Sequence, residues 1–341
     1  MRYFYRTYGL TVESDRCIQA LTPIPGDVPS PDLTFVLGCM PAWAAEALAL
    51  RRTSSKARPT EPLLGNATFT VYEYDGGRFF HLVYGDGTQF VVDRKATRLW
   101  GESGPNLSHD DLCVYLVGPV MGFILRQRGL TCLHGSALAI HGRAFALVGE
   151  AGAGKSTTAA ALALRGWPVL CEDVCALDPA EEQYHVRPGY PRICLWSDSV
   201  SFLFASPETL PYIVQGWDKR FLGLDGARAQ FADDNAPLAA IFLLAGRTED
   251  DSAPRLERVP QRETVLQLVQ NTYMNWLLST NQRAAEFDVL TSLVSRAESF
   301  RVFPSADPAR IAVLAELIES QALRVLGEHP DPALGVARGN V

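Results

Sequence analysis

The stretch Phe145–Val174, FALVGEAGAGKSTTAAALALRGWPVLCEDV, contains the residues that decide the fold. An apolar run leads into the pattern G-x-x-x-x-G-K-S, which extends from Gly149 to Ser156, and an alanine-rich segment follows it. A strand, a glycine loop and a helix in this order are typical of a phosphate-binding loop. The glycines let the backbone curl so that successive N–H groups face a phosphate, and the helix N-terminus adds partial positive charge. The stretch therefore predicts an α/β fold that binds a nucleotide.

The residues of this glycine loop have separate expected tasks. Lys155 would bridge the outer phosphates, and the hydroxyl of Ser156 would bind Mg²⁺. The expected ligands are ATP and Mg²⁺, although the motif does not specify the base. The remaining predicted contacts to the nucleotide come from the loop and the first helical turn, namely Gly149, Glu150, Ala151, Gly152, Ala153, Gly154 and Thr157.

An acidic pair, Glu172 and Asp173, begins 17 residues beyond Lys155. A phosphate-loop protein needs a carboxylate for Mg²⁺ at the end of a neighbouring apolar strand. The later apolar run, residues 236–246, ends without one, so Asp173 is the predicted metal residue. Glu172 could then orient a water, as in a nucleotidase, or accept the proton of a substrate hydroxyl, as in a kinase. The spacing does not choose between them, and a solvated charge beside a turn is the third interpretation.

The bulk composition narrows the class of protein. The chain has 341 residues, enough for two domains, and no long basic run accompanies its net charge of −7, so we expect no nucleic-acid partner. The most apolar run, residues 112–125, is too short to span a bilayer and predicts a buried helix capped by Asp110 or Asp111. Seven cysteines without a C-x-x-C pair, in a chain without a signal peptide, predict reduced thiols and a cytoplasmic protein without membrane contact.

The residue pattern changes near residue 105. Residues 1–105 predict a smaller β-rich domain, with an antiparallel meander over residues 68–93 and loop or linker over residues 51–62. Residues 106–326 predict the nucleotide-binding domain, and residues 327–341 a frayed tail. Within the second domain we expect helices over 110–128, 155–165, 262–278, 284–298 and 307–326, strands over 168–174, 236–246 and 299–304, and a strand-turn-strand hairpin that leads into the glycine loop.

His134 completes a recognisable combination in that hairpin. Residues 133–174 resemble the catalytic core of the bacterial HPr serine kinase/phosphorylase family, which has His-Gly, a hairpin, the phosphate loop, Arg-Gly and two acids at similar spacing. The resemblance implies a P-loop kinase core similar to that of ATP-dependent phosphoenolpyruvate carboxykinases. It also implies that Glu172, where the family usually has Asp, is the base toward an acceptor serine. Asp173 would then lie near Mg²⁺ and His134.

The remainder of the chain resembles divergent HPr-kinase-like proteins, some of which phosphorylate lasso-peptide precursors. The stretch HVRPGYPRICLW, residues 185–196, departs from the HPr-specific pattern and argues against HPr as substrate and against phosphorylase activity. The N-terminal domain would recognise the acceptor. Candidate contacts to phosphate or to an acidic acceptor are Arg187, Arg192, Lys219 and Arg220.

These patterns together predict an ATP- and Mg²⁺-dependent kinase that phosphorylates a hydroxyl group of a peptide or small protein. The expected acceptor residue is serine. One alternative is a P-loop ATPase or switch that acts through a binding partner. Another is a related transferase with a small-molecule acceptor, or one that transfers a nucleotidyl group. The family forms hexamers, so a homo-oligomer is compatible with the resemblance, but no interface motif is present.

Overall fold

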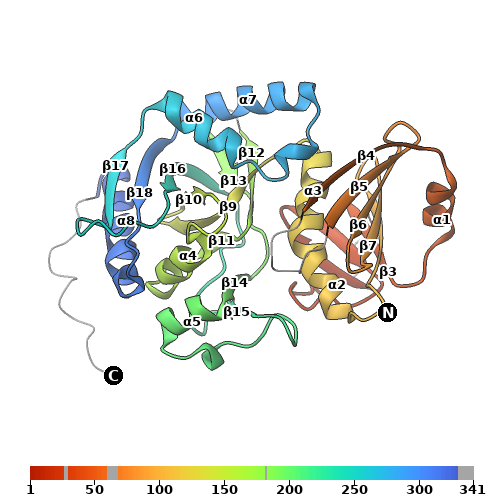
Figure 1. Ribbon diagram of the computed structural model, residues 1–341, viewed down its shortest axis with the longest axis horizontal. Helices are drawn as coiled ribbons and strands as arrows, with labels where there is room; N and C mark the ends of the chain where they lie inside the picture. Colours follow the sequence, from red (N-terminus) through yellow and green to blue (C-terminus); the bar gives the residue numbers. More distant parts are fainter. Residues whose placement is uncertain (27–29, 60–67, 181–182, 329–341) are drawn as a thin grey trace.

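The computed structural model describes residues 1–26, 30–59, 68–180 and 183–328, which form a small two-stranded sheet and two eight-stranded sheets. Figure 1 shows the two eight-stranded sheets side by side, with the first sheet in red and orange and the second in green to blue. The mixed α/β class predicted from the sequence is confirmed. The predicted tail lies, except for its first two residues, outside the described part of the chain.

The first sheet has the strand order β1-β2-β3-β8-β7-β6-β5-β4. Strand β3 is parallel to both of its neighbours, and the other pairs are antiparallel. The expected meander is confirmed as β5, β6 and β7. The elements are β1 (Tyr3–Thr7), β2 (Leu10–Ser14), β3 (Leu33–Leu37), α1 (Ala42–Ala49), β4 (Arg52–Pro59), β5 (Thr68–Tyr74), β6 (Phe79–Tyr84), β7 (Gln89–Asp93) and β8 (Arg98–Glu102).

Strand β4 corrects the expectation of a loop or linker over residues 51–62, of which residues 60–62 lie outside the described part of the chain. Residues Arg52–Pro59 pair with β5 at the edge of the sheet. Polar and charged residues are common on edge strands because they discourage pairing with another chain. Polar composition alone therefore misled the sequence interpretation.

The second sheet contains the glycine loop. Its strand order is β10-β9-β12-β13-β16-β18-β17, with β11 also paired to β9 and β10 to β16. The beginning of β9 pairs with β12, whereas its remainder pairs with β10. The strands are β9 (Thr131–Ile140), β10 (Arg143–Gly149), β11 (Val169–Cys171), β12 (Val174–Pro179), β13 (Tyr184–Val186), β16 (Ala236–Leu244), β17 (Arg255–Arg258) and β18 (Glu298–Phe303).

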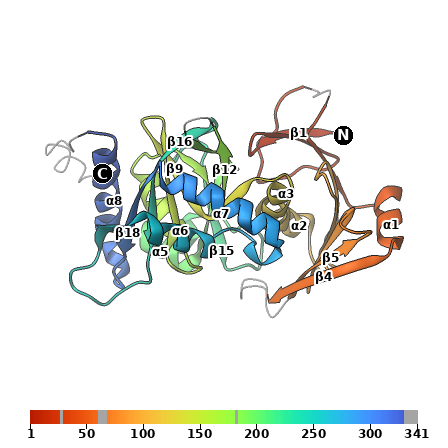
Figure 2. The same ribbon diagram turned by 90° about the horizontal axis from the view of Figure 1, so that it is seen from above.

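Strands β10, β16 and β18 are parallel neighbours and are covered on both faces. Phe145 and Leu147 face a core formed with α4 (Lys155–Leu164) and α8 (Ile311–Val325). Ala146 and Val148 face the other core, which includes α6 (Gln261–Gln270) and α7 (Thr280–Val294). Figure 1 shows α6 and α7 on one side of the strands and α4 on the other, and Figure 2 shows α6 and α7 from above. This double burial explains why the sequence of β16 is apolar without alternation.

The helical segment between the sheets consists of α2 (His109–Tyr115), a π-helical turn η1 (Leu116–Val120) and α3 (Met121–Gln127). The expected helix is confirmed, but its cap is Ser108, which forms a capping box with Asp111. Aromatic contacts join this segment to the first sheet, as between Phe80 and Phe123. One apolar core extends from the first sheet through these helices into the second sheet. The division into domains at residue 105 stays a prediction.

The turn between β1 and β2 also joins the two sheets. The N–H of Tyr8 donates to the carbonyl of Pro188 over 2.7 Å, and Thr7 Oγ1 donates to the carbonyl of Gly189 over 2.8 Å. The ring of Tyr8 is fully buried. The turn at the tip of the first sheet therefore packs against residues 187–189.

A small lobe lies beside α4. It consists of β14 (Arg192–Trp196), α5 (Ser197–Phe204), η2 (Pro207–Thr209) and β15 (Lys219–Gly223). Strands β14 and β15 form a two-stranded sheet of their own, and Arg220 of β15 also forms a single β-bridge with Tyr212. No helix of the described part of the chain is both long and apolar enough to cross a membrane.

Candidate active site

The glycine loop connects β10 to α4 as expected from its motif. Gly152 and Gly154 have positive φ angles of 81° and 95°, which glycine adopts without strain. A side chain at Gly149 would place its Cβ 2.6 Å from the carbonyl oxygen of Leu244. The glycines are thus required by backbone conformation and by close packing against β16.

Lys155 lies across the loop that precedes it. Its Nζ donates to the carbonyl oxygens of Gly149 and Glu150 over 2.8 and 2.9 Å, and the residue is only 7 % exposed. Thr157, in the first turn of α4, bonds to Ser199 over 2.9 Å. The ammonium group is therefore held inside the curl of the loop, where a phosphate would meet it.

The acidic pair forms a turn between β11 and β12. The N–H of Val174 donates to the carbonyl of Glu172 over 2.8 Å, and Asp173 between them has a φ angle of 67°. This left-handed conformation is uncommon outside glycine, although Asp adopts it more readily than most residues. The turn interrupts the alternation of side chains along a strand, so the two neighbouring carboxylates reach different partners on one edge of the sheet.

Glu172 faces the glycine loop. Its Oε1 accepts a hydrogen bond from Ser156 Oγ over 2.7 Å, and the residue is 6 % exposed. Burial, followed by the charge of Asp173, raises the pKa of Glu172 to about 7, although Lys219 and the bond from Ser156 act in the opposite direction. This carboxyl group therefore changes its charge near neutral pH.

Asp173 faces His134 instead. His134 Nε2 lies 3.3 Å from Asp173 Oδ1, and the hydroxyl of Tyr273 donates to Oδ2 over 3.0 Å. Removal from bulk water acts to raise the pKa of Asp173, but the contact with His134 and the charge of Lys219 outweigh it and lower the pKa to about 2. The side chain remains 34 % exposed. Asp173 is thus an ionised carboxylate held in place from two sides.

Tyr273 is a member of this site that the sequence did not single out. It was included in a helix expected over residues 262–278, but α6 ends at Gln270 and the following backbone crosses to β9. A Cβ at Gly122 would lie 2.3 Å from the Tyr273 ring. The small residue in α3 therefore leaves the space that lets the tyrosine reach Asp173.

The four basic candidates are not gathered at the glycine loop. Arg187 pairs with Asp178 over 3.0 Å and also donates to the carbonyl of Tyr8, so it connects the two sheets. Arg192 donates to the carbonyl of Gln19 over 2.5 Å and lies over an aromatic ring.

Of the two basic neighbours on β15, Lys219 influences the acidic turn. Its charge lowers the pKa of both carboxyl groups there, and its Nζ lies 5.0 Å from the ring centroid of Trp196. Arg220 points into the small lobe, where it is buried and donates to the carbonyl of Leu210 over 2.7 Å. Adjacent strand residues face opposite sides, so only one of them can serve the site.

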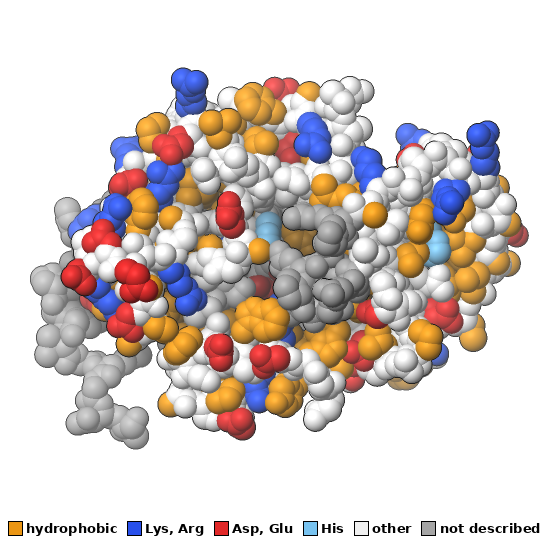
Figure 3. All heavy atoms as spheres, in the orientation of Figure 1, with side chains coloured by type: hydrophobic (Ala, Val, Ile, Leu, Met, Phe, Trp, Pro, Cys, Tyr) orange, Lys and Arg blue, Asp and Glu red, His pale blue; other side chains and the backbone are white. Residues whose placement is uncertain are grey.

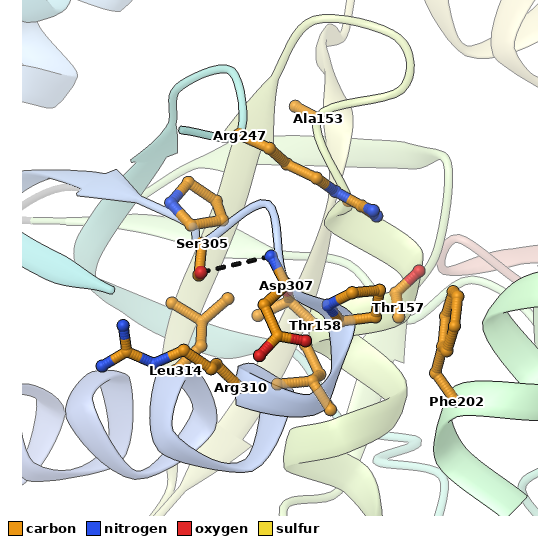
Figure 4. A pocket seen from close by; sticks show the side chains of 13 residues that line it. Ala153, Thr157, Thr158, Phe202, Arg247, Ser305, Asp307, Arg310 and Leu314 are labelled. Atoms are coloured by element: carbon orange, nitrogen blue, oxygen red, sulfur yellow. Dashed lines mark hydrogen bonds between the residues drawn. The ribbon is translucent and has the colours of Figure 1, made fainter. Parts of the chain in front are cut away.

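Arg247 is a second residue that sequence reasoning missed. It follows β16, and its Nη2 would lie 3.8 Å from a Cβ at Gly154. Figure 4 shows its side chain reaching toward the first turn of α4, along the cavity that Thr157 and Phe202 also line. The signal was present in the sequence as a basic residue directly after the buried strand.

The oxygen atoms at the turn suit a hard divalent cation. Ser156, Glu172 and Asp173 offer one hydroxyl and two carboxylates, the donor types that Mg²⁺ prefers. No group of three or more metal-ligating His, Cys, Asp or Glu side chains converges within the described residues. The set therefore fits Mg²⁺ that takes its other ligands from phosphate and water, as is usual at nucleotide sites.

Charges of both signs are interspersed on the face of the molecule shown in Figure 3, without a continuous basic patch.

His141, in the turn before β10, is exposed and pairs with Glu328 over 2.8 Å.

Comparisons with known proteins add little to this geometry. No family model matches the chain, and no curated protein matches it either. Among solved structures, the chain is similar to the Hpr(Ser) kinase/phosphatase from Coxiella burnetii, with 16 % identity and a TM-score of 0.31. The match covers 57 % of this chain and 99 % of the other. A TM-score of this size does not establish a shared fold.

Proposed function

We propose that the protein is an ATP- and Mg²⁺-dependent kinase that phosphorylates a hydroxyl group of a peptide or small protein. The proposed acceptor residue is serine. The observation that carries this proposal is the acidic turn beside the glycine loop, where Glu172 contacts Ser156 and Asp173 contacts His134. A nucleotide-binding loop needs only one carboxylate for its metal. The second carboxylate is then available as the base that takes the proton of the acceptor hydroxyl.

In the proposed step, the acceptor oxygen bonds to the γ-phosphorus while the bond to the β–γ bridging oxygen breaks and ADP leaves. The hydroxyl proton passes to Glu172. A pKa of about 7 suits a base that works at neutral pH. Lys155 and the loop N–H groups hold the phosphates, and positioning with charge neutralisation does most of the work.

Ser156 and Asp173 would hold Mg²⁺, which would neutralise phosphate charge. His134 and Tyr273 keep the carboxylate of Asp173 ionised and oriented. The hydrogen bond between Ser156 and Glu172 favours a second assignment of roles. In it, Glu172 would bind Mg²⁺ together with Ser156, and Asp173 would be the base. Both assignments give the same reaction, and the Mg²⁺ dependence of single variants separates them.

A junction cavity supports entry of the acceptor between the two sheets. Its lining includes Gln19 of the first sheet region, Val117 of η1, and Tyr190 and Arg192 near β14. Gly118, next to Val117, would place a Cβ 4.0 Å from Asp173 Oδ2. The lining is mainly apolar, so we propose that it takes an apolar part of the acceptor and that the N-terminal domain contributes to recognition.

The test is transfer from γ-labelled ATP with Mg²⁺ to a pool of serine-containing peptides, with Glu172→Gln in parallel. Label in a peptide that disappears in the variant supports the kinase. Label found only as free phosphate would sink it and leave the ATPase or switch. Label from the α-phosphate in an acceptor would instead identify a nucleotidyl transferase.

A further inference from the structure

A cavity lies beside the first turn of α4, on the Arg247 side of the glycine loop (Figure 4). Ala153, Gly154 and Thr157 form one wall. The segment that follows β16 supplies Arg247, and the segment that follows β18 supplies Pro304, Ser305, Asp307 and Pro308. The cavity therefore lies at the carboxyl ends of parallel strands, where ligands of α/β sheets bind.

The lining combines apolar side chains with the polar side chains of two threonines, two arginines, one serine and one aspartate. Phe202 of α5 is an aromatic side chain in it and is 49 % exposed, although large apolar side chains are usually buried. Asp307 is the only carboxylate that the described residues place in the lining, and its Oδ1 accepts a bond from the N–H of Ala309 over 2.9 Å. Figure 4 shows Phe202 and Asp307 on different sides of the hollow. A flat ring with polar edges is the shape that such a lining would hold.

We infer that this cavity takes the nucleoside of the bound nucleotide, with the base stacked on Phe202. The inference rests on the proposed function, since it requires that the glycine loop holds the phosphates. The cavity shares Gly154 and Thr157 with the loop and its helix, so a nucleoside attached to those phosphates reaches it without crossing other elements. Asp307 offers an acceptor to a sugar hydroxyl or a ring amine. The acidic turn then remains open for the acceptor.

Equilibrium binding of ATP and of inorganic tripolyphosphate, both with Mg²⁺, tests this inference. The unchanged protein should bind ATP more tightly than tripolyphosphate. Phe202→Ala should weaken ATP binding about tenfold, because stacking on an aromatic side chain is lost, and leave tripolyphosphate binding unchanged. Phe287 of α7 is the matched control: it is also 49 % exposed and does not line the cavity, so Phe287→Ala should change neither affinity.

The two possible failures are distinct. The nucleoside assignment is overturned if Phe202→Ala binds ATP as tightly as the unchanged protein does, or if its affinities for ATP and tripolyphosphate fall by the same factor. In either case the assignment of the glycine loop as the phosphate site is kept. If the unchanged protein binds neither ligand, the proposed function fails and this inference with it. Lys155→Ala should weaken both ligands together, which shows that the assay reports the phosphate site.

Discussion

The Ser156 side and the His134 side of the candidate site hold neighbouring carboxylates in different surroundings. On the first side, Glu172 is buried and has a raised pKa. On the second, Asp173 is partly exposed, accepts a bond from Tyr273, and has a lowered pKa. One turn thus provides a group that gains and loses a proton near pH 7 beside a group that stays charged. Surroundings that move two pKa values apart in this way let two carboxyl groups take different acid and base roles.

The largest expected effect comes from removing either charge. Glu172→Gln should lower the rate of phosphoryl transfer by about 10²–10⁴-fold, since general-base catalysis contributes about that much. Asp173→Asn should also lower the rate and, in addition, raise the Mg²⁺ concentration needed for half-maximal activity. Transfer rates measured over a Mg²⁺ series, with the exposed Glu46→Gln as control, check both expectations.

If the Mg²⁺ requirement rises in Glu172→Gln and not in Asp173→Asn, the second assignment of roles is the correct one. Full transfer activity in both variants would remove the acidic turn from the mechanism altogether.

The stability of the metal-free protein should also distinguish the two sides. The folded-state pKa of Glu172 lies above its usual value of 4.5, so this group costs stability as pH rises from about 4.5 to 7. Glu172→Gln should therefore gain about 3 kcal/mol in free energy of unfolding, relative to the unchanged protein, between pH 4.5 and 8. Denaturant unfolding at both pH values measures this. A relative stability that does not depend on pH would contradict it.

Asp173→Asn provides the opposite case in the same experiment. The lowered pKa of Asp173 stabilises the fold above its usual value of 3.8, and this contribution is lost only as pH falls toward 2. The variant should therefore be less stable than the unchanged protein at pH 5. The difference should shrink as pH rises to 8, because the charge of Asp173 also raises the pKa of Glu172. A difference that grows from pH 5 to 8 would contradict this.

A smaller effect is expected from Tyr273→Phe, which removes one hydrogen bond to Asp173. A bond to a charged group contributes about 1.5 kcal/mol or somewhat more, so the transfer rate should fall roughly tenfold. Tyr8→Phe is the control, because Tyr8 Oη has no hydrogen-bond partner among the described residues and its loss should change the rate less than twofold. Equal rates in the two variants would show that the contact of Tyr273 does not support Asp173.

The sequence predicted those parts of the site that are local in the chain. The order of strand, glycine loop and helix follows from periodicity and from the motif, and His134 with the acidic pair lies within 40 residues of it. The turn at Asp173 was not predictable, because it depends on a backbone conformation that the residue type only tolerates. Tyr273 is 100 residues away in the chain, and its position depends on where α6 ends and on the space at Gly122.

The tip between β1 and β2 has a consequence for the order in which the chain folds. Thr7 bonds to Gly189 across 182 residues of sequence. Contacts of such high sequence separation form slowly, since a long loop must close before they stabilise anything. During synthesis, the first hairpin therefore waits until residues 187–189 have been made before its tip can be buried. The strands of the first sheet can therefore pair with one another early, but the tip of this sheet stays exposed to water until residues 187–189 have been made.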